Sequence, residues 1–156
     1  MSALQGFPRI TPFLWFDNNA EEAVAFYLGV FKNSRRLDEL RNFGDAPGPK
    51  GGMLTIAFEL DGQKFTALNG GPYFKFNESV SFVVRCDSQE EVDYYWSRLT
   101  DGGAESQCGW LKDRFGLSWQ VVPARLPELV RNPKAMRAML KMKKIDLAEL
   151  ERAAKE

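Results

Sequence analysis

Residues 79–99, SVSFVVRCDSQEEVDYYWSRL, contain the pattern that decides the fold. Residues 79–86 are bulky and rich in β-branched side chains, which is typical of a strand. Ser88 then begins the sequence S-Q-E-E, a capping box in which the serine and Glu91 satisfy the free amides at the start of a helix. The predicted helix carries one apolar stripe at helical spacing, made of Val92, Tyr95, Trp96 and Leu99.

The same order of elements occurs earlier in the chain. Residues 10–16, ITPFLWF, predict a strand bounded by Pro and Asp. Asn19 is then expected to cap a helix over about 20–31, with Glu22 completing a pair that resembles a capping box. The two halves superpose with an offset of 69 to 70 residues, which indicates an internal duplication.

Strands complete both halves after the helix. In the first half we expect them at 35–43, 53–60 and 64–69, with Asp61-Gly62 as a two-residue hairpin turn between the last two. The Gly/Pro-rich stretch 44–52 is a loop, and we expect it to form a mobile lip over a cavity. In the second half, two or three short strands fit between Ala104 and Val122.

The chain is therefore predicted to be an α+β protein with two βαβββ modules, at about 8–72 and 77–124. Each module buries one face of its sheet against its helix and leaves the other face needing cover. Two such modules placed edge to edge can curve into a half-open barrel, which encloses a cavity for a small molecule. The paired modules can belong to one chain or to two.

After Pro123 the pattern becomes helical, so residues 125–156 are expected to form a C-terminal extension beyond the modules of 1–124. Asn132-Pro133 starts a helix over about 134–143. Asp146 caps a last helix, with Glu149 at its third position and an Ile145–Leu150 hydrophobic staple. The extension holds nine basic and five acidic side chains, which favours a solvated or docked helix over a nucleic-acid arm. Its methionines favour ordinary packing on the body or on a partner, with a peptide or cofactor groove as the alternative.

Composition excludes several classes of function. The chain has 156 residues, 21 basic and 21 acidic side chains and no histidine, so a serine–histidine triad and an imidazole zinc site are excluded. Zero net charge gives no reason to bind nucleic acid, and the short apolar runs predict no membrane span and no secretory signal. Cys86 and Cys108 provide no disulfide framework, so the cytoplasm is the expected location.

Four segments carry a resemblance to a known family: AEEAVAFYLGVFKNSR (20–35), VSFVV with the SQEEVDYYW helix (80–96), CGWLKDRFGLSWQVVP (108–123) and AMLKMKKIDLAEL (138–150). With these segments the chain resembles the PhnB-like family, often labelled 3-demethylubiquinone-9 3-methyltransferase. This family belongs to the vicinal-oxygen-chelate superfamily, which has the glyoxalase and bleomycin-resistance fold. The resemblance implies the paired βαβββ fold and a homodimer, but it implies less about activity, because such folds host many chemistries.

Metal-dependent relatives hold a divalent ion with four inward side chains, mostly His and Glu. The resemblance places these positions here at Pro12, Asn69, Ser81 and Gln120. Neutral side chains of this kind hold a divalent ion poorly, so we expect no metal and no cofactor. Methyl transfer is also disfavoured, because the paired glycines lie in loops and none opens a helix after a strand.

The function expected from these observations is the binding of a small apolar or aromatic molecule without a metal. The predicted ligand-binding residues are Trp15, Trp110 and Trp119 as walls, with Asn69, Ser81 and Gln120 as polar contacts. Two alternatives remain: a small-molecule enzyme, such as a metal-dependent isomerase, lyase or dioxygenase or the labelled methyltransferase, and a structural role for the tail. No catalytic residue is assigned, because Cys108 has no histidine to activate it. The carboxylates of Asp113 and Glu59 can equally serve solubility.

Overall fold

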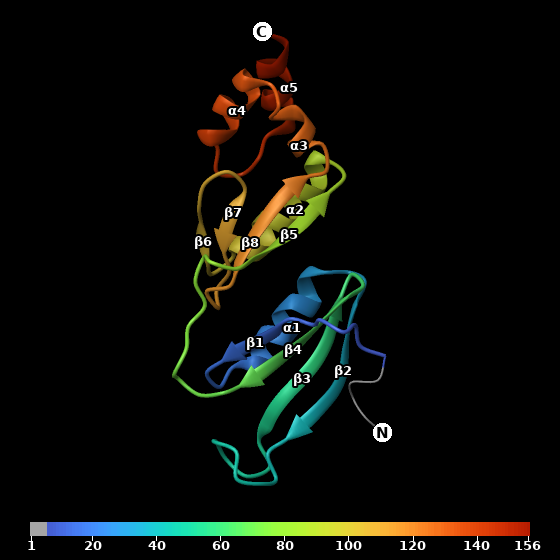
Figure 1. Ribbon diagram of the computed structural model, residues 1–156, viewed down its shortest axis with the longest axis vertical. Helices are drawn as coiled ribbons and strands as arrows, with labels where there is room; N and C mark the ends of the chain where they lie inside the picture. Colours follow the sequence, from blue (N-terminus) through green and yellow to red (C-terminus); the bar gives the residue numbers. More distant parts are fainter. Residues whose placement is uncertain (1–5) are drawn as a thin grey trace. The chain divides into compact units, whose positions relative to one another are not determined.

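The computed structural model describes residues 6–156. The chain folds into two compact units, the first ending at Lys75 and the second running from Phe76 to Glu156. Figure 1 shows the elements of both units in the order in which they follow along the chain.

The first unit is a βαβββ module. Its elements are β1 (Phe13–Phe16), α1 (Ala20–Val30), β2 (Ser34–Arg41), β3 (Met53–Leu60) and β4 (Gln63–Asn69). The strands lie in the order β1-β4-β3-β2, with β1 parallel to β4 and the other neighbours antiparallel. The hairpin turn is confirmed, since Asp61 and Gly62 adopt positive φ angles of 48° and 89°, as a type I′ turn requires.

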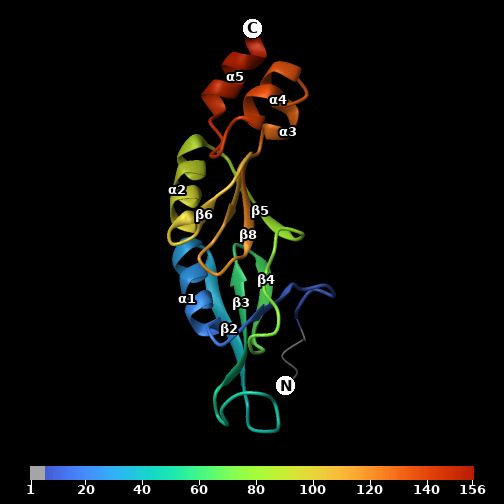
Figure 2. The ribbon, with the colours of Figure 1, turned by 90° about the vertical axis from the view of Figure 1, so that its left-hand side faces the viewer.

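Helix α1 covers one face of this sheet (Figure 2). Tyr27 is fully buried and its ring stacks on Phe58 at 6.2 Å, while Phe58 stacks on Phe65 at 5.3 Å. Successive strand residues point to opposite faces, so Phe13 and Trp15 lie on the face away from the helix. Phe13 is 60% exposed there, which leaves this face of the unit uncovered.

The second unit repeats the module. Its sheet and helix are β5 (Ser81–Cys86), α2 (Gln89–Thr100), β6 (Ala104–Glu105), β7 (Trp110–Lys112) and β8 (Ser118–Pro123). The strand order β5-β8-β7-β6, with β5 parallel to β8, matches that of the first unit. Two βαβββ modules in an α+β fold are therefore present, as the duplication predicted.

The two helices begin differently. Ser88 Oγ accepts from Glu91 N at 3.2 Å, so the serine half of the predicted capping box of α2 is confirmed. The Glu91 carboxylate accepts from Asp87 N at 2.6 Å, one residue before the Ser88 amide that a capping box uses. Asn19 precedes α1, but its side chain makes no capping hydrogen bond, and the predicted pairing with Glu22 is wrong. The backbone of Asn19 has a ψ of 28° instead of the extended conformation that side-chain caps need.

Several predicted boundaries shift by a few residues. The first strand begins at Phe13 instead of residue 10, because Pro12 has no amide to donate to a strand ladder. Three strands form between Ala104 and Pro123, at the upper end of the prediction. The helix expected over 134–143 ends earlier, at Leu140.

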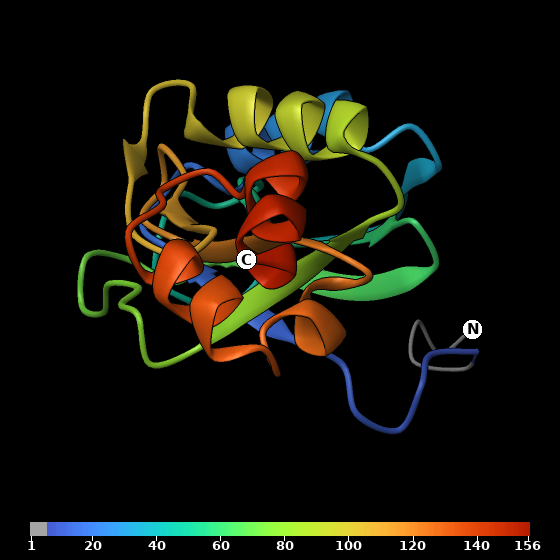
Figure 3. The same cartoon turned by 90° about the horizontal axis from the view of Figure 1, so that it is seen from above.

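The C-terminal extension forms three helices, α3 (Leu126–Leu129), α4 (Pro133–Leu140) and α5 (Leu147–Lys155), which gather in Figure 3. They enclose a small core of Leu126, Ala135, Met142, Ile145 and Leu150. Both predicted caps are confirmed, since Asn132 accepts from Lys134 N at 2.8 Å and Asp146 accepts from Glu149 N at 3.1 Å. The buried pair Ile145 and Leu150 is the expected staple.

Hydrogen bonds fix this extension to the rest of the second unit. The Gln89 side chain donates to Ile145 O at 3.0 Å and accepts from Leu147 N at 2.9 Å. Cys108 N also donates to Met142 O at 2.8 Å. The extension is thus docked on its own unit. Within residues 6–156, no helix is long and apolar enough to cross a membrane.

Candidate functional site

The open face of the second sheet gathers polar and aromatic side chains. Residues paired across strands point to the same side of a sheet, so the register places a set of residues on the face opposite α2. This set contains Ser81, Val83, Trp110, Lys112, Ser118 and Gln120. Val83 is 60% exposed, so the face is open to solvent in this unit.

Ser81 and Gln120 meet on this face. Gln120 Nε2 donates to Ser81 Oγ at 3.0 Å, and both side chains are half-buried. Within the described part of the chain, the Gln120 carbonyl oxygen has no donor, and the serine proton is still available to donate. Trp110 pairs with Gln120 across the neighbouring strand and is also half-buried. The structure therefore brings three of the six predicted ligand-binding residues together.

Ser118 was not predicted, yet it is the most unusual residue on this face. Its side chain is fully buried, and its Oγ has no hydrogen-bond partner among residues 6–156. A buried hydroxyl without a partner costs about 1–3 kcal/mol. The sequence gives no signal for it, because burial and hydrogen bonding cannot be read from the residue type.

Trp119 lies on the opposite side of the sheet, because it is adjacent to Gln120 in the strand. It is 3% exposed, and its Nε1 donates to the Asp113 carboxylate at 2.9 Å. Asp113 also accepts from Phe115 N at 2.8 Å and Leu117 N at 3.1 Å. Trp119 and Asp113 therefore hold the β7–β8 turn against the core, away from the open face.

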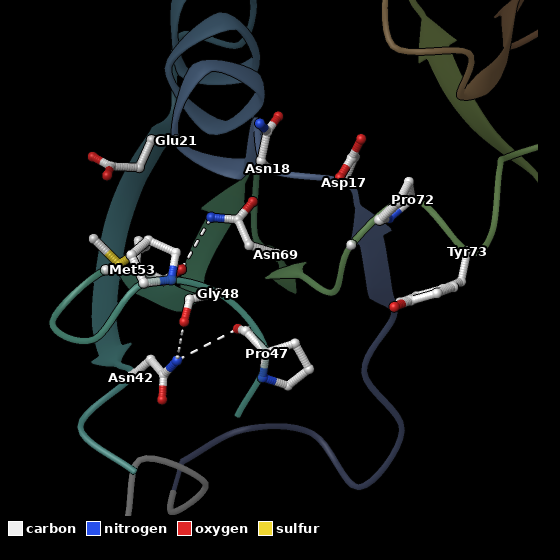
Figure 4. Close-up of a pocket in the computed structure, with 13 residues that line it drawn as sticks. Asp17, Asn18, Glu21, Asn42, Pro47, Gly48, Met53, Asn69, Pro72 and Tyr73 are labelled. Carbon is white, nitrogen blue, oxygen red and sulfur yellow. Dashed lines mark hydrogen bonds between the residues drawn. The ribbon is translucent and has the colours of Figure 1, made fainter. Parts of the chain in front are cut away.

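A hollow of about 480 Å³ lies within the first unit (Figure 4). It is bounded by the end of β4, the start of α1 and the loop after β2. The lining includes Asp17, Glu21, Met53, Asn69 and Tyr73. The lining thus combines carboxylate and amide groups with apolar side chains, as in many small-molecule pockets.

Asn69 lines this hollow while also holding its walls together. Its Oδ1 accepts from Ala20 N at 2.9 Å, so it supplies the cap that Asn19 does not. Its Nδ2 donates to Met53 O at 3.1 Å, the dashed line above Met53 in Figure 4. Asn69 thereby joins β4 to the starts of α1 and β3, a structural role that the sequence did not indicate.

The loop at residues 44–52 contributes Pro47, Gly48, Pro49 and Gly52 to the lining of the same hollow. Asn42, only 4% exposed, fastens it by donating to Ala46 O at 2.8 Å and to Gly48 O at 3.3 Å. The mobility of this loop stays a prediction.

Trp15 lies on the open face of the first sheet, and its indole covers the chain after β4. Its Nε1 donates to Gly71 O at 2.9 Å, and Phe74 contacts the ring edge-on at 4.9 Å. A Cβ at Gly70 would lie 2.4 Å from the indole, so this packing requires glycine. A ligand that contacts Trp15 would lie beside the packed indole and the chain segment after β4.

Strand register revises the comparison of the two modules. Gln120 lies three residues before Pro123, the last paired residue of β8, whereas Asn69 is itself the last paired residue of β4. The counterpart of Gln120 in the first module is therefore Thr66, and the counterpart of Ser81 is Thr11.

The revised set contains hydroxyls and one amide, and it has no carboxylate, thiolate or imidazole. Such donors do not fit a divalent metal ion, which takes its binding strength from charged or basic ligands. Residues 6–156 also hold no group of three or more Asp, Glu, Cys or His that could ligate a metal.

Cys86 does not support nucleophilic chemistry. Cys86 is buried, and burial first, with the charges of Glu91 and Asp87, raises its pKa from 9.0 to about 12. It is therefore a neutral thiol at physiological pH. Cys108 is half-buried and uses its backbone amide to hold the C-terminal extension.

Comparison with known proteins identifies relatives of the paired modules. Residues 8–122 match the family model described as 3-demethylubiquinone-9 3-methyltransferase. The match ends before α3, so the C-terminal helices lie outside it. Among curated proteins, none matches the chain significantly.

Solved structures show the same fold. A PhnB protein of Bacillus cereus, described as a 3-demethylubiquinone-9 3-methyltransferase, is 32% identical with a TM-score of 0.68, and the match covers 75% of this chain and 100% of that one. A protein of Pseudomonas aeruginosa is 24% identical with a TM-score of 0.61, covering 74% and 97%. The fosfomycin resistance protein FosX of Listeria monocytogenes, complexed with Mn(II) and sulfate, is 16% identical with a TM-score of 0.58, covering 83% and 99%.

Proposed function

The chain belongs to the 3-demethylubiquinone-9 3-methyltransferase-like, or PhnB-like, family of the vicinal-oxygen-chelate superfamily, and from this premise we propose that it binds a small apolar or aromatic molecule without a metal ion. The binding surface is the open face of the second sheet. Trp110 supplies the apolar wall, and Ser81 and Gln120 orient the ligand.

The hydrogen bond between Gln120 and Ser81 is the observation that carries this proposal. It fixes the amide, and it leaves the side-chain carbonyl oxygen of Gln120 as an acceptor and the Ser81 hydroxyl as a donor for a ligand on the same face. Half-buried groups of this kind select ligands that satisfy them, because a ligand without matching polar atoms leaves them unpaired.

The donor set supports binding without a metal. FosX, as its description states, is complexed with Mn(II), but at 16% identity it shares only the fold with this chain. In this chain the four inward positions, as revised by the strand register, carry hydroxyl and amide groups. Methyl transfer gains no support from the strand–helix turns, because β1–α1 and β5–α2 are joined by Asp, Asn and Ser residues and contain no glycine.

We also propose that the protein is a homodimer in the cytoplasm. Phe13 and Val83 are each 60% exposed on the open faces of their sheets, and apolar side chains on such faces favour cover by a second copy. Both cysteines are free thiols, which fits a reducing compartment. Analytical ultracentrifugation tests the dimer, and a monomer at micromolar concentration would contradict it.

A thermal-shift screen of aromatic metabolites tests the function, with wild type, Gln120→Ala and Gln63→Ala compared. Gln63 is an exposed control whose amide bonds only to the adjacent Lys64 carbonyl. A ligand at a hundred times its Kd stabilises by about 2.7 kcal/mol, or roughly 5–10 °C in Tm for a chain of this size. Loss of one hydrogen bond weakens binding by up to about tenfold, so Gln120→Ala should show about half of this shift.

The Gln63→Ala control should respond like wild type. Equal shifts in Gln120→Ala and wild type would place the ligand elsewhere. Elemental analysis of the purified protein checks the other half of the proposal, and one divalent metal ion per chain would refute metal-free binding.

A further inference from the structure

A small pocket adjoins the proposed binding surface on the second unit. It has a volume of about 210 Å³ and lies where β6, β7 and β8 meet. Trp110, Lys112 and Ser118 line it from the open face, and Glu78 and Glu105 also contribute to its lining. Pockets for drug-sized molecules measure roughly 300–1,000 Å³, so this one suits a single aromatic ring.

The Ser118 hydroxyl indicates that a hydrogen-bond partner is missing from this pocket. The residue is fully buried and lines the pocket, and its Oγ has no partner within residues 6–156. Buried hydroxyls in folded proteins are nearly always hydrogen-bonded, to protein, water or ligand. A ligand atom in the pocket would provide the missing partner.

Lys112 makes the pocket donor-rich. Its Nζ contacts Glu78 at 3.1 Å, and the ammonium has further N–H groups to donate. The hydrogen bond from Lys112 lowers the pKa of Glu78, so this carboxylate is charged at neutral pH and balances the lysine. With Glu105 the lining has a net negative charge, which disfavours an anionic ligand.

We infer that the ligand of the proposed function carries a neutral carbonyl oxygen on an aromatic ring, and that this oxygen accepts hydrogen bonds from Ser118 and Lys112 while the ring lies against Trp110. The inference rests on the proposed function and names the chemical class of its ligand. The carbonyl matches two donors, and its neutrality matches the acidic lining. An aromatic ring suits both the pocket volume and the indole wall.

Three probes of one ring size test this class by calorimetric titration: acetophenone, α-methylstyrene and benzoate. Acetophenone and α-methylstyrene have the same shape, but only the ketone has an oxygen acceptor. One hydrogen bond is worth about three- to tenfold in Kd, so the two bonds from Ser118 and Lys112 should make wild type bind acetophenone about ten- to hundredfold tighter than α-methylstyrene. Benzoate should bind more weakly than acetophenone.

Ser118→Ala and the control Ser97→Ala, an exposed helix residue, locate the donor. Ser118→Ala should lose the part of this preference that its hydroxyl supplies, about three- to tenfold, while Ser97→Ala keeps the full preference of wild type. Binding of α-methylstyrene should not change in Ser118→Ala, which shows that the variant is folded.

The outcomes separate the two proposals. Equal affinity of wild type for acetophenone and α-methylstyrene, or an unchanged preference in Ser118→Ala, overturns the carbonyl inference while aromatic binding stands. Tighter binding of benzoate than of acetophenone overturns it too. If none of the three probes binds and the metabolite screen finds no ligand, the proposed function itself fails.

Discussion

Replacing Asn69 by alanine should destabilise the first unit by about 2 kcal/mol. The change removes the oxygen that caps α1 at Ala20 N, and loss of a side-chain cap costs about 1 kcal/mol. It also removes the donor to Met53 O, and a hydrogen bond of this kind contributes about 1 kcal/mol more. The two contributions act at different ends of the same amide, so we expect them to add.

Urea denaturation followed by circular dichroism measures this loss. With a slope of about 2 kcal/mol per molar urea, the midpoint of the transition that includes the first unit should fall by about 1 M. Asn69→Asp keeps an oxygen for the cap but sets a second oxygen against Met53 O, so it should also be less stable than wild type. Hydrogen exchange at the amides of Ala20 and Glu21 should speed up in the alanine variant.

Asn19→Ala is the matched control, because Asn19 occupies the N-cap position of α1 without making a side-chain bond. It should change stability by less than about 0.5 kcal/mol. The reasoning is refuted if Asn19→Ala costs as much as Asn69→Ala, since the cap would then be the local one that the sequence indicates.

Three further changes test other parts of the structure. Asp113→Ala should lower the free energy of unfolding, measured by urea denaturation, by about 3 kcal/mol, because three donors lose their acceptor. The control Asp101→Ala loses only an exposed ion pair with Arg114 and should lower it by less than about 1 kcal/mol. Because the pKa of Cys86 is raised in the folded state, its thiol ionises at a lower pH in the unfolded chain, and the free energy of unfolding should fall between pH 9 and about 12 by up to about 1.4 kcal/mol per pH unit. Cys86→Ala should remove this part of the slope, and an identical slope in both proteins would contradict the reasoning. Gly103→Ala should cost about 3 kcal/mol because its Cβ would lie 2.1 Å from Lys112 O, while Gly44→Ala, with open space around it, should be nearly neutral by the same assay.

The elements with local signals could be predicted from the sequence. The capping box of α2, the Asn132 and Asp146 caps and the Asp61-Gly62 turn all rely on residues within a few positions of one another. Hydrophobic spacing predicted helices α1 and α2, and the repeated order of elements indicated the two modules, whereas the short helix α3 was not predicted.

The start of α1 could not be predicted in this way, because its cap comes from a residue 49 positions away. No local pattern distinguishes Asn69, at the end of a strand, from the turn residue that it resembles. Asn19 had the expected residue type, but the backbone around it does not place its side chain over the helix.

The candidate site was predictable only in part. Ser81 and Gln120 followed from the family resemblance, and the structure joins them by a hydrogen bond. Trp119 lies on the other face because one residue of shift reverses the direction of a strand side chain. Ser118 is recognised only when burial and hydrogen bonding are known, neither of which the sequence records.

The two helix caps become available at different points of synthesis. Helix α2 carries its start signal within its own first residues, so the capping side chain is present as soon as that segment has been synthesised. Helix α1 obtains its start from Asn69, which is synthesised only after three further strands have begun. A nascent chain that stops before residue 69 therefore lacks the side chain that caps α1, so the start of this helix is coupled to completion of the sheet.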